Sequence, residues 1–189
     1  FYNNVKITNV SGTELTNKKQ ESVTSGSTTT YYCYVYIGDV INLTQNTGHS
    51  SLRSAVINAT AGDTLMIMKA LTQTSSIDIS KNLTLVSYNS SAILIGKLVI
   101  TSGTTTFGTS SYDYYGKNTI TATGGSKLIF SDCDIASYDS NPTVIALNAT
   151  VQVNGGIIYH SEGGIAMQLG DASNKATFGS RGGTIGSTT

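Results

Sequence analysis

The sequence predicts an all-β protein whose chain coils repeatedly through three parallel sheets. The first observation behind this prediction is composition: the 189 residues include 24 Ser, 28 Thr and 14 Asn but only one Pro and no Trp. Thr, Val, Ile and Tyr favour strands, whereas Gly, Asn and Ser favour turns. Charged residues make up only 12% of the chain, so the charge pairs that support exposed helices are scarce.

The second observation is a repeat of short apolar stripes from Asp63 onward. Each repeat of about 20–30 residues carries up to three stripes, with Gly, Asn, Asp or Ser between them. A β-sandwich also has short strands at regular spacing. Stripes of two to four residues that recur in the same order favour the solenoid instead, in which like positions stack from turn to turn. One series of stripes comprises Ile77/Ile79, Leu98/Ile100, Leu128/Phe130, Val151/Val153 and Ala176/Phe178.

One short helix is predicted over residues 51–60. Ser50 or Ser51 can cap its start, and Gly62 can end it. Its apolar face consists of Leu52, Ala55 and Val56.

Residues 1–48 are predicted to be a separate strand-and-loop segment, and residues 49–189 the solenoid. The polar run 14–30 is predicted to be a loop, and a strand with two apolar faces follows at 31–37. A further strand at 4–10 has no obvious partner in the coil, so it could add to a neighbouring subunit's sheet. Its apolar residues are Val5, Ile7 and Val10.

Ser80-Lys81-Asn82 separates two apolar stripes and is predicted to be a corner rather than a hairpin. A two-residue hairpin needs positive φ at both central residues, and only Asn82 tolerates it readily. We therefore expect Asn82 to take the left-handed conformation and Lys81 to turn outward.

The stretch "SLRSAVINATAGDTLMIMKALTQTSSIDISKNLTLVSYNSSAILIGKLVITSG" resembles the opening of a right-handed parallel β-helix of the pectate-lyase-like class, found in many microbial surface proteins. The resemblance covers roughly residues 50–189 and implies that the short helix caps the coil. This fold hosts lyases, hydrolases, tailspikes, adhesins and structural proteins. The family's enzymes use several Asp with Arg or Lys, or Asp pairs with Gly-His-Gly and Arg-Ile-Lys segments. This chain has no Asp-Asp, Gly-His-Gly or Arg-Ile-Lys, so we expect neither catalytic residues nor a cofactor.

Two polar pairs could carry chemistry. Asp132 and Asp134 would share a face of an extended segment and could hold a cation or act as an acid/base pair. His160 and Glu162 would also share a face but supply too few metal ligands. We favour a polar corner for Asp132 and Asp134, and solvated turn residues for His160 and Glu162. His49 is also expected to be a solvated residue.

Cysteines, sequons and tyrosines provide the other candidate sites. Cys33 and Cys133 could form a disulfide or remain two buried thiols. Tyrosines in a predicted exposed insertion could contact a partner; they are Tyr112, Tyr114 and Tyr115. Asn-x-Ser/Thr sequons, either glycosylation acceptors or corner residues, occur at Asn9, Asn42, Asn58, Asn82, Asn89 and Asn148.

The expected function is that of a non-enzymatic extracellular structural protein. Lys+Arg and Asp+Glu balance at 11 each, which argues against nucleic acid or an anionic membrane as a partner. No apolar run is long enough to span a membrane. We expect self-association into a surface filament, sheath or surface layer through the open ends of the coil. The alternatives are a carbohydrate-binding or polysaccharide-cleaving module, and an adhesin fragment.

Overall fold

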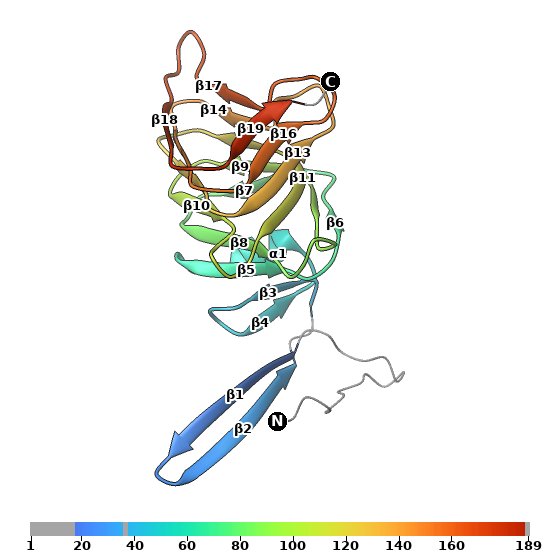
Figure 1. The fold of residues 1–189 in the computed structure, drawn as a ribbon, viewed down its shortest axis with the longest axis vertical. Helices are drawn as coiled ribbons and strands as arrows, with labels where there is room; N and C mark the ends of the chain where they lie inside the picture. Colours follow the sequence, from blue (N-terminus) through green and yellow to red (C-terminus); the bar gives the residue numbers. More distant parts are fainter. Residues whose placement is uncertain (1–17, 36–37, 188–189) are drawn as a thin grey trace. The chain divides into compact units, whose positions relative to one another are not determined.

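The computed structural model describes residues 18–35 and 38–187 and divides the chain into units 1–37 and 38–189 (Figure 1). The first unit contains an antiparallel hairpin of β1 (Lys18–Ser25) and β2 (Thr28–Val35). Its two-residue loop begins with Gly26 at φ 62°, a conformation that glycine adopts freely. The prediction that residues 14–30 form a loop was therefore wrong. The strand predicted at 4–10 lies outside the described residues.

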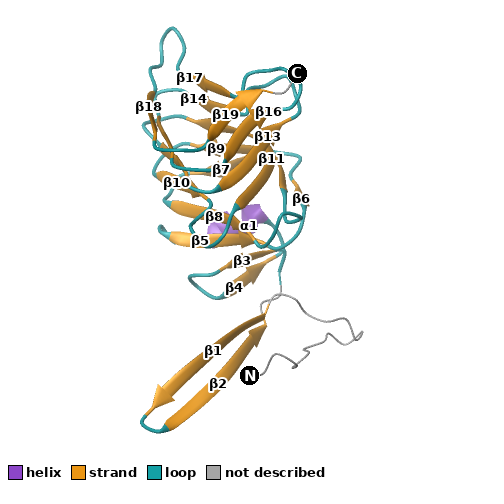
Figure 2. Cartoon of the chain, viewed as in Figure 1, coloured by secondary structure: helices purple, strands orange, loops and turns teal. Residues whose placement is uncertain are grey.

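The second unit is a parallel β-solenoid of about five turns, mostly β with one short helix, which confirms the predicted fold class (Figure 2). An eight-stranded sheet forms its first face. The solenoid strands of that face are β5 (Asp63–Ile67), β8 (Leu83–Ser87), β10 (Thr104–Phe107), β12 (Lys127–Phe130), β15 (Thr150–Val153) and β18 (Thr177–Ser180).

A second long sheet bends into two further faces because β9 (Leu94–Ile100) and β11 (Tyr114–Ala122) run through both of them. The second face contains their first halves with β6 (Leu71–Thr72), β13 (Cys133–Ser137), β16 (Ile157–His160) and β19 (Thr184–Ser187). The third face contains their second halves with β7 (Ile77–Ile79), β14 (Val144–Ala146) and β17 (Met167–Leu169).

The stripe series derived from the sequence changes face partway along the chain, so that part of the prediction was wrong. Its first two stripes lie on the third face, in β7 and β9, whereas its later stripes lie on the first face, in β12, β15 and β18. The slip occurs at the predicted insertion, where β11 begins at Tyr114 and continues for nine residues without a turn. Because the strand is continuous, no turn residue marks the boundary between its two apolar stripes.

Aromatic side chains stack along the inside of the coil. Phe107 pairs in register with Leu85 on one side and Phe130 on the other. The Phe107 and Phe130 rings stack at 5.1 Å, and Tyr114 meets Phe107 edge-on at 5.0 Å. All three aromatic side chains are fully buried. Each turn is therefore stabilised by apolar contact with the turns on either side of it.

The predicted helix is confirmed as α1 (Leu52–Asn58). Ser51 caps it by accepting a hydrogen bond from the Ser54 amide at 3.1 Å, and its buried face is the one expected. Lys81 reaches back from the next turn and donates to the carbonyl oxygen of Ala59 at 2.8 Å. A cation at this end of the helix satisfies a free carbonyl and complements the helix dipole.

The solenoid unit begins at Gly38 rather than at residue 49, because a second hairpin belongs to it. β3 (Val40–Asn42) pairs antiparallel with β5 and with β4 (Thr47–His49), which extends the first face. Buried Asn42 ties this hairpin to β5 by donating to the carboxylate of Asp63 at 2.7 Å.

The segment Ser80-Lys81-Asn82 is a corner, as predicted, because it joins β7 on the third face to β8 on the first. Asn82 is not in the left-handed region, so that detail was wrong. Among the described residues other than glycine, positive φ occurs at Asn46 and at Asn148. The side chain of Asn82 instead accepts a hydrogen bond from the Thr104 amide at 2.8 Å, which links two turns.

Candidate functional site

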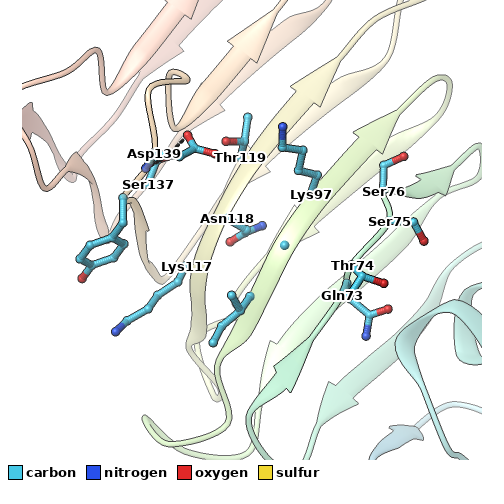
Figure 3. A pocket seen from close by; sticks show the side chains of 13 residues that line it. Gln73, Thr74, Ser75, Ser76, Lys97, Lys117, Asn118, Thr119, Ser137 and Asp139 are labelled. Carbon is cyan, nitrogen blue, oxygen red and sulfur yellow. Dashed lines mark hydrogen bonds between the residues drawn. The ribbon is translucent and has the colours of Figure 1, made fainter.

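A groove of about 380 Å³ lies along the bend between the second and third faces (Figure 3). Its floor comes from the middle of β9 and β11, and its walls come from residues 73–76 on one side and 137–139 on the other.

Differences in loop length between turns produce this groove. The first turn leaves β6 at Thr72 and re-enters β7 at Ile77, and the fourth leaves β13 at Ser137 and re-enters β14 at Val144. The two turns between them cross the bend as continuous strands. Gly96 makes this possible in β9, since its φ is 139° and a Cβ there would lie 2.8 Å from the backbone oxygen of Gln73.

Ser137 and His160 are in register with each other at the bend, and Asn118 lies one residue beyond the Lys117–Ala136 pair. Each of these three polar residues is at most 3% exposed. Ser137 Oγ donates to the carboxylate of Asp139 at 3.0 Å. His160 Nδ1 accepts from the Gly164 amide at 3.0 Å, and its Nε2 lies 2.7 Å from the Asp139 carbonyl oxygen. These contacts tie the imidazole ring of His160 to the backbone of the loops beside it. The side chains of Ser137 and His160 each bind a loop that leaves the strand at the bend.

Asn118 lies at the bend in a turn that has no loop. Its side-chain amide lies beside Gly116 and Tyr114 on the inward face of β11, and neither its oxygen nor its nitrogen makes a hydrogen bond of standard length and angle. The hydroxyl of neighbouring Thr119 makes none either. Both side chains are at least 95% buried and line the groove. A buried polar group without a partner costs about 1–3 kcal/mol, so this pair stands out as a candidate site.

The hydroxyl of Tyr114 is a third buried polar group without a hydrogen bond in the same strand. Burial raises the pKa of Tyr114, and a hydrogen-bonding interaction with the side chain of Asn118, longer than a standard hydrogen bond, offsets part of this rise. Tyr114 therefore stays neutral, and it contributes no charge beside Asn118.

The groove also carries both signs of charge. Lys97 and Lys117 are exposed on its floor, and Lys117 Nζ lies 4.9 Å from the centre of the Tyr138 ring. Burial acts to raise the pKa of Asp139, but hydrogen bonds from Asn141 and Ser137 and the charge of Lys97 outweigh it, so the pKa lies below its usual value. Asp139 is therefore an anion at neutral pH.

The carboxylates predicted as a pair, Asp132 and Asp134, are both exposed on either side of buried Cys133. The hydrogen bond from Tyr115 to Asp113 at 2.7 Å, partial burial and the charges of these carboxylates raise the pKa of Tyr115 to about 12. Within residues 18–35 and 38–187, no group of three or more His, Cys, Asp or Glu is arranged to hold a metal ion.

The predicted His160–Glu162 pair is not a pair in the structure. His160 is 2% exposed and binds loop backbone, so its assignment as a solvated turn residue was wrong, whereas Glu162 is exposed. His49 lies at the end of β4, with its Nε2 3.1 Å from the hydroxyl of Thr47.

Cys133 is a free thiol in the structure. The side chain of Cys33 lies outside the described part of the chain, so both the disulfide and a second buried thiol stay predictions. Cys133 is 3% exposed. Burial, with the charges of Asp132 and Asp134, raises the pKa of its thiol to about 12. It is therefore a protonated core side chain and a poor nucleophile.

The sequons differ in accessibility. Asn42 is completely buried and both ends of its side-chain amide are hydrogen-bonded, so its prediction as an acceptor was wrong. Asn9 lies outside the described residues. The exposed members, which stay predictions, are Asn58, Asn82, Asn89 and Asn148.

The three tyrosines predicted as contact residues also separate. Tyr112 is 43% exposed and Tyr115 is partly buried, so both remain candidates. Tyr114 is fully buried against Phe107, and its prediction as an exposed contact was wrong.

Sequence analysis did not single out the groove residues. The signal that could have found them is the length of two apolar runs, Leu94–Ile100 and Tyr114–Ala122, which contain a Gly-Lys dipeptide but no loop between their stripes. Runs of this kind predict that the strand bends without a loop. Where neighbouring turns do have a loop at the same place, a groove forms between those loops.

The fold defines the chain as a parallel β-solenoid protein. No protein-family model matches it, and searches of curated proteins and of solved structures find no match. Among the residues that the structure describes, no helix is long and apolar enough to cross a membrane.

Proposed function

We propose that this protein is a non-enzymatic extracellular structural protein whose copies associate end to end through the last turn of the coil. The observation that carries the proposal is a group of apolar side chains in core register at that end. A chain rich in Ser, Thr and Asn with only 12% charged residues supports an extracellular location.

Inward-facing apolar side chains are part-exposed in the last turn that the structure describes. Phe178 is in register with buried Val151, and Ile185 is in register with buried Ile158. Leu169 continues the third face in the same way. Each of these three end residues is 40–41% exposed. Exposed apolar side chains grouped in this way mark an association surface.

The opposite end of the coil offers a matching edge. β4 ends the first face there and β18 ends it at the last turn. Because β3 is antiparallel to both β4 and β5, β4 runs in the same direction as the solenoid strands. β18 of one copy can therefore continue the parallel sheet at β4 of another. The helix beside this edge leaves Ile57 69% exposed.

A contact that joins the last turn of one copy to the opposite end of another copy is heterologous. Repeated without closing into a ring, such a contact produces a filament. Added strands would also protect backbone groups at both sheet edges. Under this proposal, the partner at the last turn is a second copy whose β4 edge continues the first face.

Replacing Phe178 with Asp tests this proposal. We expect the wild-type protein to form larger assemblies with rising concentration in sedimentation velocity, and Phe178→Asp to remain monomeric, because a carboxylate would be buried at the contact. Phe178 is part-exposed in the isolated chain, so the variant should retain the wild-type circular dichroism spectrum.

Tyr112→Asp is the matched control, since Tyr112 is 43% exposed in a loop away from the last turn. It should associate like wild type. Monomeric wild type at every concentration, or unchanged association of Phe178→Asp, would contradict the proposal. Coverage of Phe178 by further residues of the same chain would contradict it as well.

A further inference from the structure

The geometry points to Tyr138 and Tyr159 as a site of oxidative cross-linking, where a peroxidase using hydrogen peroxide joins the two rings into dityrosine. Their hydroxyl oxygens lie 3.4 Å apart, although the two residues are 21 positions apart in the chain. Tyr138 belongs to the loop between β13 and β14, and Tyr159 belongs to β16 of the next turn. The bond would therefore join two turns of the coil. This inference does not depend on the end-to-end association.

The residues on either side of Tyr138 are bound to the strand that carries Tyr159. Ser137 pairs in register with His160, and the Nε2 atom of His160 lies 2.7 Å from the carbonyl oxygen of Asp139. The loop cannot carry Tyr138 away from Tyr159 without breaking these contacts. Groups held at short range react as if they were at a very high concentration. The pair should therefore couple within one molecule before either ring meets a second molecule.

Both side chains reach the surface, where an oxidant can act on them. Tyr138 is 45% exposed and Tyr159 is partly buried. The ammonium group of Lys117 lies 4.9 Å from the centre of the Tyr138 ring and helps to position that ring. The hydrogen bond with Tyr138, partial burial and the charge of Asp134 raise the pKa of Tyr159 to about 12. Tyr159 is therefore a neutral phenol at neutral pH, and its oxidation releases a proton as well as an electron.

The cross-link forms by a two-electron oxidation. Each phenol gives up one electron and one proton and becomes a phenoxyl radical, whose unpaired electron is shared with the ring carbons next to the oxygen. One such carbon of each ring forms the new C–C bond, and the hydrogens of these carbons move to the oxygens and restore both hydroxyls. One hydrogen peroxide accepts the two electrons and two protons and yields two water molecules. In the product the two hydroxyls lie side by side, as the hydroxyls of Tyr138 and Tyr159 already do.

Mass spectrometry of the protein after treatment with peroxidase and hydrogen peroxide tests the inference. At a dilution where the protein is monomeric, we expect dityrosine fluorescence and an intact mass lower by two hydrogen atoms. Peptide mapping should locate the new bond between Tyr138 and Tyr159, and Tyr138→Phe and Tyr159→Phe should each abolish this bond. Tyr112→Phe is the matched control, because Tyr112 is 43% exposed but lies in another loop. It should cross-link like wild type.

Urea unfolding separates the cross-link from an effect of the substitutions on the fold. Before oxidation, Tyr138→Phe should unfold at the same urea concentration as wild type, because its side chain is half-exposed. A covalent bond between turns reduces the entropy of the unfolded chain, as a disulfide does, so oxidised wild type should resist urea better than untreated protein. Tyr138→Phe should gain no such resistance. Unmodified tyrosines, dityrosine between other residues or between molecules only, or a cross-linked protein without greater resistance to urea would overturn the inference.

Discussion

Phe107→Ala should destabilise the solenoid unit by about 4 kcal/mol, among the largest effects expected of a single core substitution. Phe107 is fully buried in the third turn, and its ring contacts Tyr114 and Phe130. Removing the ring leaves a cavity that neighbouring turns cannot close without losing their own register. Urea unfolding followed by circular dichroism measures the change.

Thr106→Ala is the control for this substitution, because Thr106 is adjacent in β10 and only partly buried on the opposite side of the strand. We expect it to change stability by less than about 0.5 kcal/mol. Since each turn contacts only its neighbours, hydrogen exchange in Phe107→Ala should accelerate most in β8, β10 and β12. Equal effects of the two substitutions would contradict the stacked core.

Asp63→Ala should cost about 3 kcal/mol, because three donors depend on one carboxylate oxygen. Asp63 Oδ2 accepts from Asn42 and Gln45 at 2.7 Å each and from the Thr60 amide at 2.8 Å. Asp63 is 3% exposed and Asn42 is fully buried, so the substitution leaves buried donors without partners. Asp78→Ala, an exposed aspartate in β7, should have little effect in the same unfolding experiment.

The same carboxylate makes stability depend on pH. Burial acts to raise the pKa of Asp63, but hydrogen bonds from Asn42, Thr60 and Gln45 and the charge of Lys81 prevail, and the pKa lies below 3.8. The folded state therefore binds this proton less well than the unfolded state. The stabilisation is present above pH 3.8 and is lost as the pH falls through the lower folded value. Wild type should lose its advantage over Asp63→Ala in that acid range, and an advantage independent of pH would contradict this role.

The solenoid was predictable because its main determinant is local. Paired apolar residues such as Ile77 and Ile79 alternate within short stretches, and Ser51 and the apolar face of α1 are ordinary helix signals. The phase of the repeat was less predictable, because β11 crosses from one face to another with no turn residue to mark the bend. The hairpin of β1 and β2 was missed because its first strand, "KKQESVTS", is almost entirely polar.

The candidate groove was beyond sequence reasoning for a different reason. Asn118 lies in an apolar run and resembles other polar residues of the chain. Its position at the bend, one residue beyond the Lys117–Ala136 pair, depends on how many residues each turn contains. Likewise, nothing local distinguishes buried Tyr114 from exposed Tyr112.

Cryo-electron microscopy of the native material tests end-to-end association most directly. We expect filaments in which the first face continues from β18 of one copy to β4 of the next, with Phe178, Ile185 and Ile57 buried at the junction. Single particles alone, or filaments whose copies touch along the sides of the coil and leave Phe178 exposed, would contradict the proposed function.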